Sequence, residues 1–106
     1  MPGSIYRIDP ERDREFAEEF RRNPVGHHSP GLQRVLNVFR RLPLKGKHVL
    51  VCTKPHKEWQ LATLSGEQGK PVQLVKGKVY RSLAEAERDV FRIRWRAVTG
   101  ETLRGA

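Results

Sequence analysis

The most constraining feature of this sequence is its last helical segment, SLAEAERDVFRIRWRAVTG, which opens with a capping box at Ser82 and Glu85. Gly100 is expected to end the segment, so we predict a helix over residues 82–99. Its apolar residues form one stripe and a second set beside that stripe: Leu83, Ala86, Val90, Ile93 and Ala97, then Phe91, Trp95 and Val98. This apolar face is wider than a lone surface helix needs, so we expect the helix to pack on a sheet and to meet something else as well.

Two residue pairs, an aspartate and a serine each followed by proline, predict two helices earlier in the chain. Asp9-Pro10 opens an acidic segment with Phe16 and Phe20 four residues apart, which predicts a helix over residues 8–22. Ser29-Pro30 opens the next helix, within a connector and second helix that we assign to residues 23–46. Its apolar positions follow the i, i+3, i+4, i+7 rule of an amphipathic helix: Leu32, Val35, Leu36 and Phe39.

The segment between the second and third helices has the composition of strands. KHVLVCT predicts a buried strand, EWQLATL a second strand, and PVQLV a third and weaker one. The loop KPHK and the turn SGEQGK separate these strands, because Pro55 cannot occupy a central ladder. Residues 47–80 are therefore predicted to form a three-stranded antiparallel meander. The expected fold over residues 1–106 is a single α+β domain with two N-terminal helices and a C-terminal helix packed on the sheet.

Charge is distributed unevenly over the 106 residues, whose formal net charge is +9. Six acidic residues lie between Asp9 and Glu19, whereas the chain after Phe20 has 18 basic and 6 acidic residues. An acidic first helix on a basic body would orient the chain against a charged partner, or fold the helix back onto the basic part.

No apolar run is long enough to cross a bilayer, and the start MPGSIYRIDPE lacks the apolar core of a signal peptide. Cys52 is the only cysteine, which excludes an internal disulfide. The expected compartment is therefore the reducing cytoplasm.

Two adjacent histidines, His27 and His28, precede the second helix and are the most conspicuous candidates for chemistry. Adjacent side chains point in different directions, whereas a helical metal pair needs i, i+4 spacing and a zinc site needs three or four ligands. We therefore predict no metal site. The two histidines are assigned to the connector, where they set the angle of the helix or contact a partner.

Catalytic groups are equally hard to assemble from this sequence. Cys52 lies in an apolar strand, where a cysteine is expected to act as a small hydrophobe rather than a nucleophile. The acidic residues that could act as acid or base fall in turns or on exposed helix faces. We predict no catalytic residue, and a stand-alone enzyme stays a third hypothesis that turnover by the pure protein would establish.

Basic residues recur at helical spacing in the last helix, where they make nucleic-acid binding the alternative function: Arg88, Arg92 and Arg96, with Arg81 and Arg94 nearby. Such a patch neutralises phosphates, and Trp59 or Tyr80 would stack on bases. A solvated helix face with local acid–base pairs explains the same arginines. No zinc finger, aromatic RNA-binding signature or glycine-x-x-glycine loop accompanies them.

A motif in the connector and second helix carries a family resemblance: Asn-Pro-x-Gly, then His-Ser-Pro, then Leu-Gln-Arg-Val-x-Asn-x-Phe-Arg. These positions are Asn23, Pro24, Gly26, His28, Ser29, Pro30, Leu32, Gln33, Arg34, Val35, Asn37, Phe39 and Arg40. Glu58-Trp59 and Ala62-Thr63 continue the pattern weakly, so that it spans residues 10–98. In these features the chain resembles the small, alpha subunit of N,N-dimethylformamidase. The resemblance implies a larger partner subunit that holds a single iron and hydrolyses the formamide. It also implies a small chain with no iron ligand, cofactor or catalytic residue of its own.

The polar face of the second helix agrees with such a partner. Its long arginine and amide side chains suit recognition of another protein's carboxylates and carbonyls, although ordinary solvent exposure explains them too. We predict a non-catalytic accessory subunit that binds and stabilises a larger metal-dependent amide hydrolase in a hetero-oligomer. The predicted partner-binding residues are His27, His28, Gln33, Arg34, Asn37, Arg40, Arg41, Trp59, Arg92 and Arg96.

Overall fold

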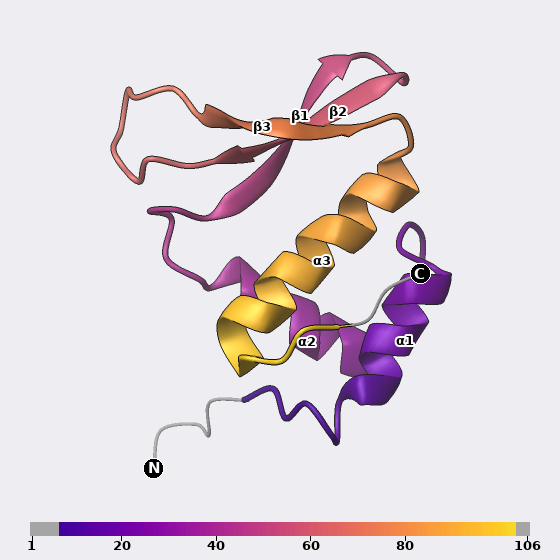
Figure 1. Ribbon diagram of the computed structural model, residues 1–106. Coiled ribbons are helices and arrows are strands. Elements are labelled where there is room, and N and C mark those ends of the chain that lie inside the picture. The colour runs from indigo at the N-terminus through magenta and orange to yellow at the C-terminus, as the bar shows by residue number, and fades with distance from the viewer. Residues whose placement is uncertain (1–6, 104–106) are drawn as a thin grey trace.

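The computed structural model describes residues 7–103 and confirms the predicted α+β fold (Figure 1). Three helices and three strands follow in the order α-α-β-β-β-α: α1 (Arg14–Arg22), α2 (Pro30–Arg40), β1 (His48–Lys54), β2 (Glu58–Thr63), β3 (Gln73–Tyr80) and α3 (Leu83–Thr99). The strands form one antiparallel sheet in the order β1-β2-β3, as expected for a meander. No helix within residues 7–103 is long and apolar enough to cross a membrane.

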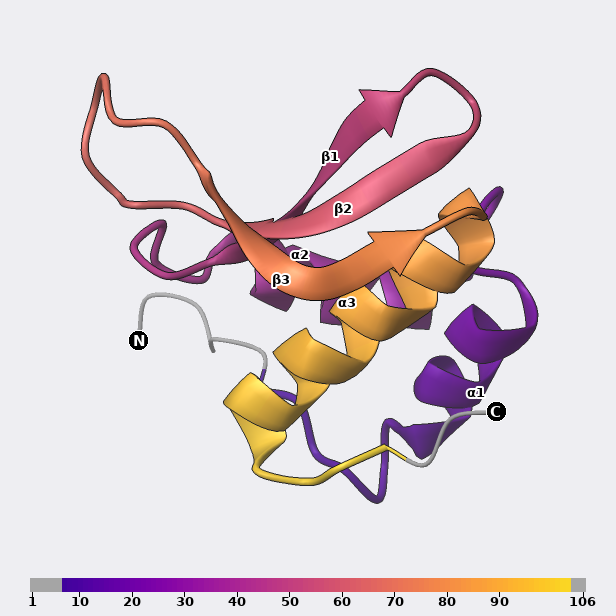
Figure 2. The same ribbon diagram turned by 45° about the horizontal axis from the view of Figure 1, so that its top comes forward.

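The last helix, α3, lies between the sheet and the other two helices (Figure 1, Figure 2). On its sheet side Ala86 and Val90 pack in a cluster with Leu61 of β2. On its other side Phe91 and Trp95 pack in a larger cluster with side chains of α1 and α2. Both sides of the wide apolar face are therefore covered within the chain, and the second contact predicted for this helix is intramolecular.

Aromatic rings hold the three helices together in the larger cluster. The ring of Phe91 is stacked on that of Phe20 of α1, with centres 4.3 Å apart, and meets Phe39 of α2 edge-on at 5.2 Å. The Trp95 ring lies 5.9 Å from the same Phe91 ring. Aromatic pairs of this kind add about 0.5–1.5 kcal/mol each beyond the burial of their area. Phe91 thus fixes the positions of α1 and α2 relative to α3.

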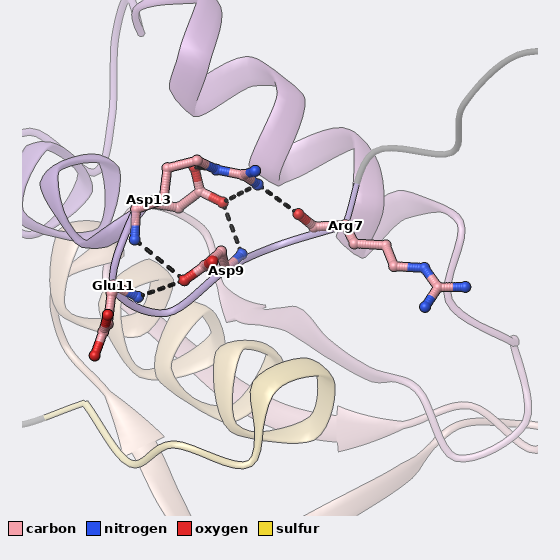
Figure 3. Close-up of polar contacts among 5 residues, drawn as sticks. Arg7, Asp9, Glu11 and Asp13 are labelled. Carbon is pink, nitrogen blue, oxygen red and sulfur yellow. Dashed lines mark hydrogen bonds and ion pairs between the residues drawn. The ribbon is translucent and has the colours of Figure 1, made fainter.

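The first helix begins later than the sequence predicted. The Asp9 carboxylate accepts the backbone N–H groups of Glu11 at 2.9 Å and Arg12 at 3.2 Å, and residues 10–13 form a turn (Figure 3). The predicted start at residue 8 was wrong because the Asp9-Pro10 signal caps this turn instead. The helix itself starts at Arg14, with Asp13 at the N-cap position.

Asp13 is buried, with only 1% of its surface exposed. Its carboxylate accepts the backbone N–H of Asp9 at 2.9 Å and the guanidinium of Arg12 at 3.0 Å (Figure 3). Arg12 in turn donates to the carbonyl of Arg7 at 2.6 Å. The sequence suggested only that Asp13 favours the positive end of a helix dipole. In the structure it fastens the segment that precedes α1 to the start of that helix.

The second helix begins as predicted, with the Ser29 hydroxyl accepting the N–H of Leu32 at 3.2 Å. Gly31 follows in the first turn and is buried against Phe16 of α1. A Cβ atom at this glycine would lie 2.1 Å from the nearest carbon of the Phe16 ring. α1 and α2 therefore approach closely only because residue 31 has no side chain.

We expect Gly31→Ala to lower the free energy of unfolding by about 1–3 kcal/mol, the usual range for overpacking a close contact. Alanine is the better helix former by about 1 kcal/mol, so a net loss would show that the clash outweighs propensity. Urea unfolding of Gly31→Ala alone and in a Phe16→Ala background measures this. The penalty should vanish when the ring is absent, and an equal penalty in both backgrounds would contradict the contact.

The first strand was predicted to be buried, and this was wrong. Residues 48–51 are partly buried, residues 52–54 are exposed, and the sheet is covered by α3 on one face only. Cys52 is consequently exposed rather than packed as a small hydrophobe. It lies near the tip of the β1–β2 hairpin, which projects away from α3 (Figure 2).

The third strand is longer than the PVQLV segment predicted for it. Gln60 of β2 pairs with Val79, whereas Ala62 pairs with Leu74, so β3 contains an irregularity with extra residues between these pairs. Gly77 lies within it at a φ of 78°, a conformation that glycine adopts without strain. The bulge lets the strand continue to Tyr80, which reaches the sheet-side core.

Candidate partner-binding surface

The connector between α1 and α2 holds the two predicted histidines in different environments. The His28 ring nitrogen Nε2 lies 3.0 Å from the carbonyl of Asn23, and its ring centre lies 5.6 Å from that of Phe20. His27 is exposed, and its carbonyl accepts the side-chain amide of Asn23 at 3.2 Å. The pair therefore belongs to the connector, as predicted. Within residues 7–103 no group of three histidine, cysteine or acidic residues is arranged to hold a metal ion.

Glu19 is a structural residue that the sequence did not reveal. Its carboxylate accepts the backbone N–H of Ser29 at 2.8 Å and the Ser29 hydroxyl at 2.5 Å. These two bonds tie the last turns of α1 to the N-cap of α2, and the hydroxyl bond is the main reason that the pKa of Glu19 is lowered. Only the contact across ten residues reveals this role, because the spacing resembles no local capping pattern.

The polar face of α2 contains both locally bonded side chains and exposed arginines. Gln33 donates its amide to the carbonyl of His28 at 3.0 Å, so it stabilises the connector. Arg40 donates to the side chain of Asn37 at 2.8 Å. Arg34 of the same helix and Arg41 at its C-cap are exposed. The two histidines thus precede the N-terminal end of α2, and the five other predicted residues follow along one face of this helix and its C-cap.

The other three predicted contact residues lie elsewhere. Trp59 packs against the cluster beneath the sheet, on the side that α3 covers. Arg92 and Arg96 are residues of α3. Arg92 forms an ion pair with Asp89 at 3.2 Å, and Arg96 donates to the hydroxyl of Thr102 at 3.0 Å. These three residues do not join the α2 surface. The ten predicted positions therefore do not form a single site.

A pocket of about 400 Å³ lies among the connector, α2 and α3. Its lining contains His28 and Arg40 from the predicted set, together with Glu87 and Arg94 of α3. Arg94 donates to the carbonyl of His48 at 2.7 Å, and its buried Nε atom has no acceptor within the described chain. Burial lowers the pKa of Arg94, the nearby Glu87 raises it, and the first effect prevails.

Glu87 is the acidic group of this pocket. Burial raises the pKa of its carboxyl, and the positive charges of Arg94 and His28 offset only part of that rise. A raised pKa in the folded state means that the unfolded chain loses this proton first as the pH increases. The protein therefore loses stability as the pH rises from the ordinary glutamate range through the raised pKa of Glu87.

We expect Glu87→Gln to remove this loss, so that the variant is more stable than the parent chain at pH 7 and similar to it at pH 3.5. Urea unfolding across this pH range provides the measurement. Glu11→Gln is the control, because Glu11 is exposed in the turn before α1 and should change little at either pH. Parallel pH curves for the parent chain and Glu87→Gln would contradict the effect.

Tyr80, one of the two aromatic residues proposed to stack on bases, is not available for that role. Tyr80 is buried, and its hydroxyl donates to the carboxylate of Asp89. Burial, followed by this hydrogen bond, raises the pKa of Tyr80. Burial alone would raise the pKa of Asp89, but the Tyr80 bond and the Lys78 charge lower it overall. The expectation of a Tyr80 stacking platform was therefore wrong.

Comparison with known proteins places the chain in a family. A search of curated proteins finds no match. The family model of the N,N-dimethylformamidase alpha subunit matches residues 4–104, which is nearly the whole chain. The match extends far beyond the motif of the connector and second helix, and it includes the sheet and α3. The chain therefore belongs to the N,N-dimethylformamidase alpha subunit family.

Proposed function

We propose that this chain is a non-catalytic accessory subunit that binds and stabilises a larger, metal-dependent amide hydrolase in the cytoplasm. The observation that carries the proposal is the match of residues 4–104 to an enzyme's alpha subunit. A subunit family of this kind is consistent with a hetero-oligomer that contains a larger chain. On this proposal the iron expected in the hydrolase is held by the larger chain.

The chemistry of the conspicuous polar residues supports the same view. Glu19 is used to fasten two helices, and His28 lies against the Asn23 carbonyl and the Phe20 ring. Asp13 is bonded to the backbone of Asp9 and to Arg12. Glu19, His28 and Asp13 thus have structural partners in the fold.

The contacts of the arginines of α3 favour the accessory-subunit proposal over nucleic-acid binding. Arg88 donates to the carbonyl of Arg21 at 2.7 Å and Arg94 to that of His48, so both hold neighbouring elements in place. Arg92 is paired with Asp89. Their guanidinium groups are partly committed to the protein itself rather than arrayed for phosphates.

Co-expression tests the proposal. This chain, carrying an affinity tag, would be produced together with the large dimethylformamidase-type chain encoded in the same genome. We expect the two to co-purify at a fixed ratio, with iron in the complex and none in the small chain alone. Hydrolysis of N,N-dimethylformamide should require the large chain. A small chain that elutes alone, or that hydrolyses the amide unaided, would overturn the proposal.

A further inference from the structure

The face of the sheet that points away from α3 is left open by the described chain. Figures 1 and 2 show the helices on one side of the sheet only, with no helix or loop over the opposite side (Figure 1, Figure 2). Leu50, Leu61 and Val75 pack in the cluster on the α3 side. Because successive side chains alternate between faces, their neighbours along each strand must point to the open side.

The strand register identifies the side chains that share this open face. Val49 of β1 is opposite Ala62 of β2, which is opposite Leu74 of β3. Val51, Gln60 and Val79 form the adjacent row. Directly opposed residues lie on the same face, so five aliphatic side chains share this face with Gln60, whose amide donates to the carboxylate of Glu58 at 3.4 Å. We call these six residues the outer sheet face.

This face is apolar and accessible at its β3 side. Leu74 is 51% exposed and Val79 is 47% exposed, and both belong to the few large hydrophobic residues exposed in the described chain. Val72, in the loop before β3, is exposed as well. Ala62 is 0% exposed, so the accessible aliphatic surface of this face comes mainly from Leu74 and Val79, beside the partly buried Val49 and Val51. An exposed aliphatic surface on one face of a sheet is typical of a protein contact. The polar face of α2 offers no comparable apolar centre.

The surroundings of the outer sheet face are positively charged. Residues 45–81 contain eight lysines and arginines and two glutamates, a net charge of +6. Both glutamates form ion pairs. A carboxylate oxygen of Glu58 lies 3.9 Å from Nζ of Lys54, and one of Glu67 lies 2.6 Å from Nζ of Lys70. Lys57 and Lys76 are exposed and form no ion pair within residues 7–103. The surface that fits this face therefore has an apolar centre and an acidic rim.

We propose that the outer sheet face is the surface through which this chain docks onto the larger hydrolase subunit, against an apolar patch rimmed by carboxylates. This inference rests on the proposed function. The aliphatic centre of the outer sheet face would form the dehydrated core of the interface, and the lysines around this centre would steer association. The residues of α2 would then lie outside this core, because their helix is on the other side of α3.

Two other occupants fit the observations less well. A second copy of the chain would bring two basic segments together, each with a net charge of +6 over residues 45–81, and these repel each other. Nucleic acid would find the positive charge but no exposed ring on this face, because Trp59 and Tyr80 face α3. The positive charge therefore disfavours a second copy, and the aliphatic centre disfavours nucleic acid.

Affinity measurements with the large dimethylformamidase-type chain test the inference. We expect Leu74→Glu and Val79→Glu each to raise the Kd of the complex at least tenfold, because each places a carboxylate in the apolar centre among acidic neighbours. Val25→Glu is the matched control, since Val25 is 49% exposed in the connector, nearly as much as Val79. Lys57→Glu with Lys76→Glu should slow association and weaken its dependence on salt. Circular dichroism and urea unfolding of each variant confirm that it remains folded.

The outcomes separate the two proposals. If the parent chain binds and the sheet variants bind equally well, the outer sheet face is not the interface, and the proposed function stands. Loss of binding in Arg34→Glu with Arg41→Glu, but not in the sheet variants, would assign the interface to α2 instead. If the parent chain does not bind the large chain at all, the proposed function fails together with this inference. A homodimer that Leu74→Glu dissociates, or an oligonucleotide bound at the sheet in place of the large chain, would also overturn it.

Discussion

Trp95→Ala should lower the free energy of unfolding by about 3–5 kcal/mol, the range for truncating a large buried aromatic residue. Trp95 is 0% exposed and packs in the cluster that joins α3 to α1 and α2. Domains of this size have a total stability on the order of 5–15 kcal/mol, so this single change removes a large part of it. The midpoint of thermal unfolding should fall by more than about 10 °C. Urea and thermal unfolding of the purified chain give both quantities.

Trp95→Phe provides the informative comparison. The indole N–H of Trp95 is buried and has no acceptor within the described chain, so phenylalanine removes an unsatisfied donor along with some packing. We expect a cost of only about 1–2 kcal/mol. Trp59→Ala, at a partly exposed position of β2, should also cost less than Trp95→Ala. Equal effects for Trp59 and Trp95 would mean that the helical cluster does not dominate stability.

Asp13→Ala should lower the free energy of unfolding by about 1–3 kcal/mol, because it leaves the backbone N–H of Asp9 without its acceptor. Asp13→Asn keeps the shape and one acceptor oxygen, so its cost should be smaller. Hydrogen exchange at the Asp9 amide should accelerate in Asp13→Ala, and chemical denaturation measures the loss of stability.

Glu11→Gln is the control for this prediction. Glu11 is an exposed carboxylate in the same turn, and its backbone N–H rather than its side chain bonds to Asp9. Its replacement should change stability by less than about 0.5 kcal/mol. A similar loss for Glu11→Gln and Asp13→Ala would show that general acidity of the segment matters, and not the buried carboxylate.

The start of each later helix was predictable because capping is a local interaction. Ser29 and Ser82 cap α2 and α3 with bonds to residues three positions ahead, which a sequence pattern records directly. Gly100 ends α3 at a φ of 78°, as its position suggested. Asp9-Pro10 is the exception, because the same local chemistry also caps an isolated turn. Only the burial of Asp13 decides that the helix starts afterwards.

Burial on the sheet was harder to predict because the sequence does not say how many faces are covered. KHVLVCT has the composition of a fully buried strand, yet β1 lies at an edge and only α3 covers the sheet. The apolar runs of β1 and β3 therefore supply an open face as well as a core. The bulge that extends β3 across Gly77 depends on pairing with β2, which local propensity does not encode.

The candidate site shows the same division. The sequence predicted the connector and the polar face of α2 as candidate contacts, since both follow from a contiguous motif and a helical period. It did not identify Glu19 as the partner of Ser29, Glu87 as a pocket residue, or the outer sheet face as a shared surface. Each of these joins residues from different elements.

The sequence by itself determined the α+β class, the order of the elements, the caps of α2 and α3, and the family to which the chain is similar. These properties depend on side-chain periodicity and on contacts within a few residues. The tertiary structure alone decided which apolar residues are covered, because α3 can shield only one face of the sheet while its other side is occupied by α1 and α2. Long-range packing therefore selects which apolar surface of the described chain stays exposed.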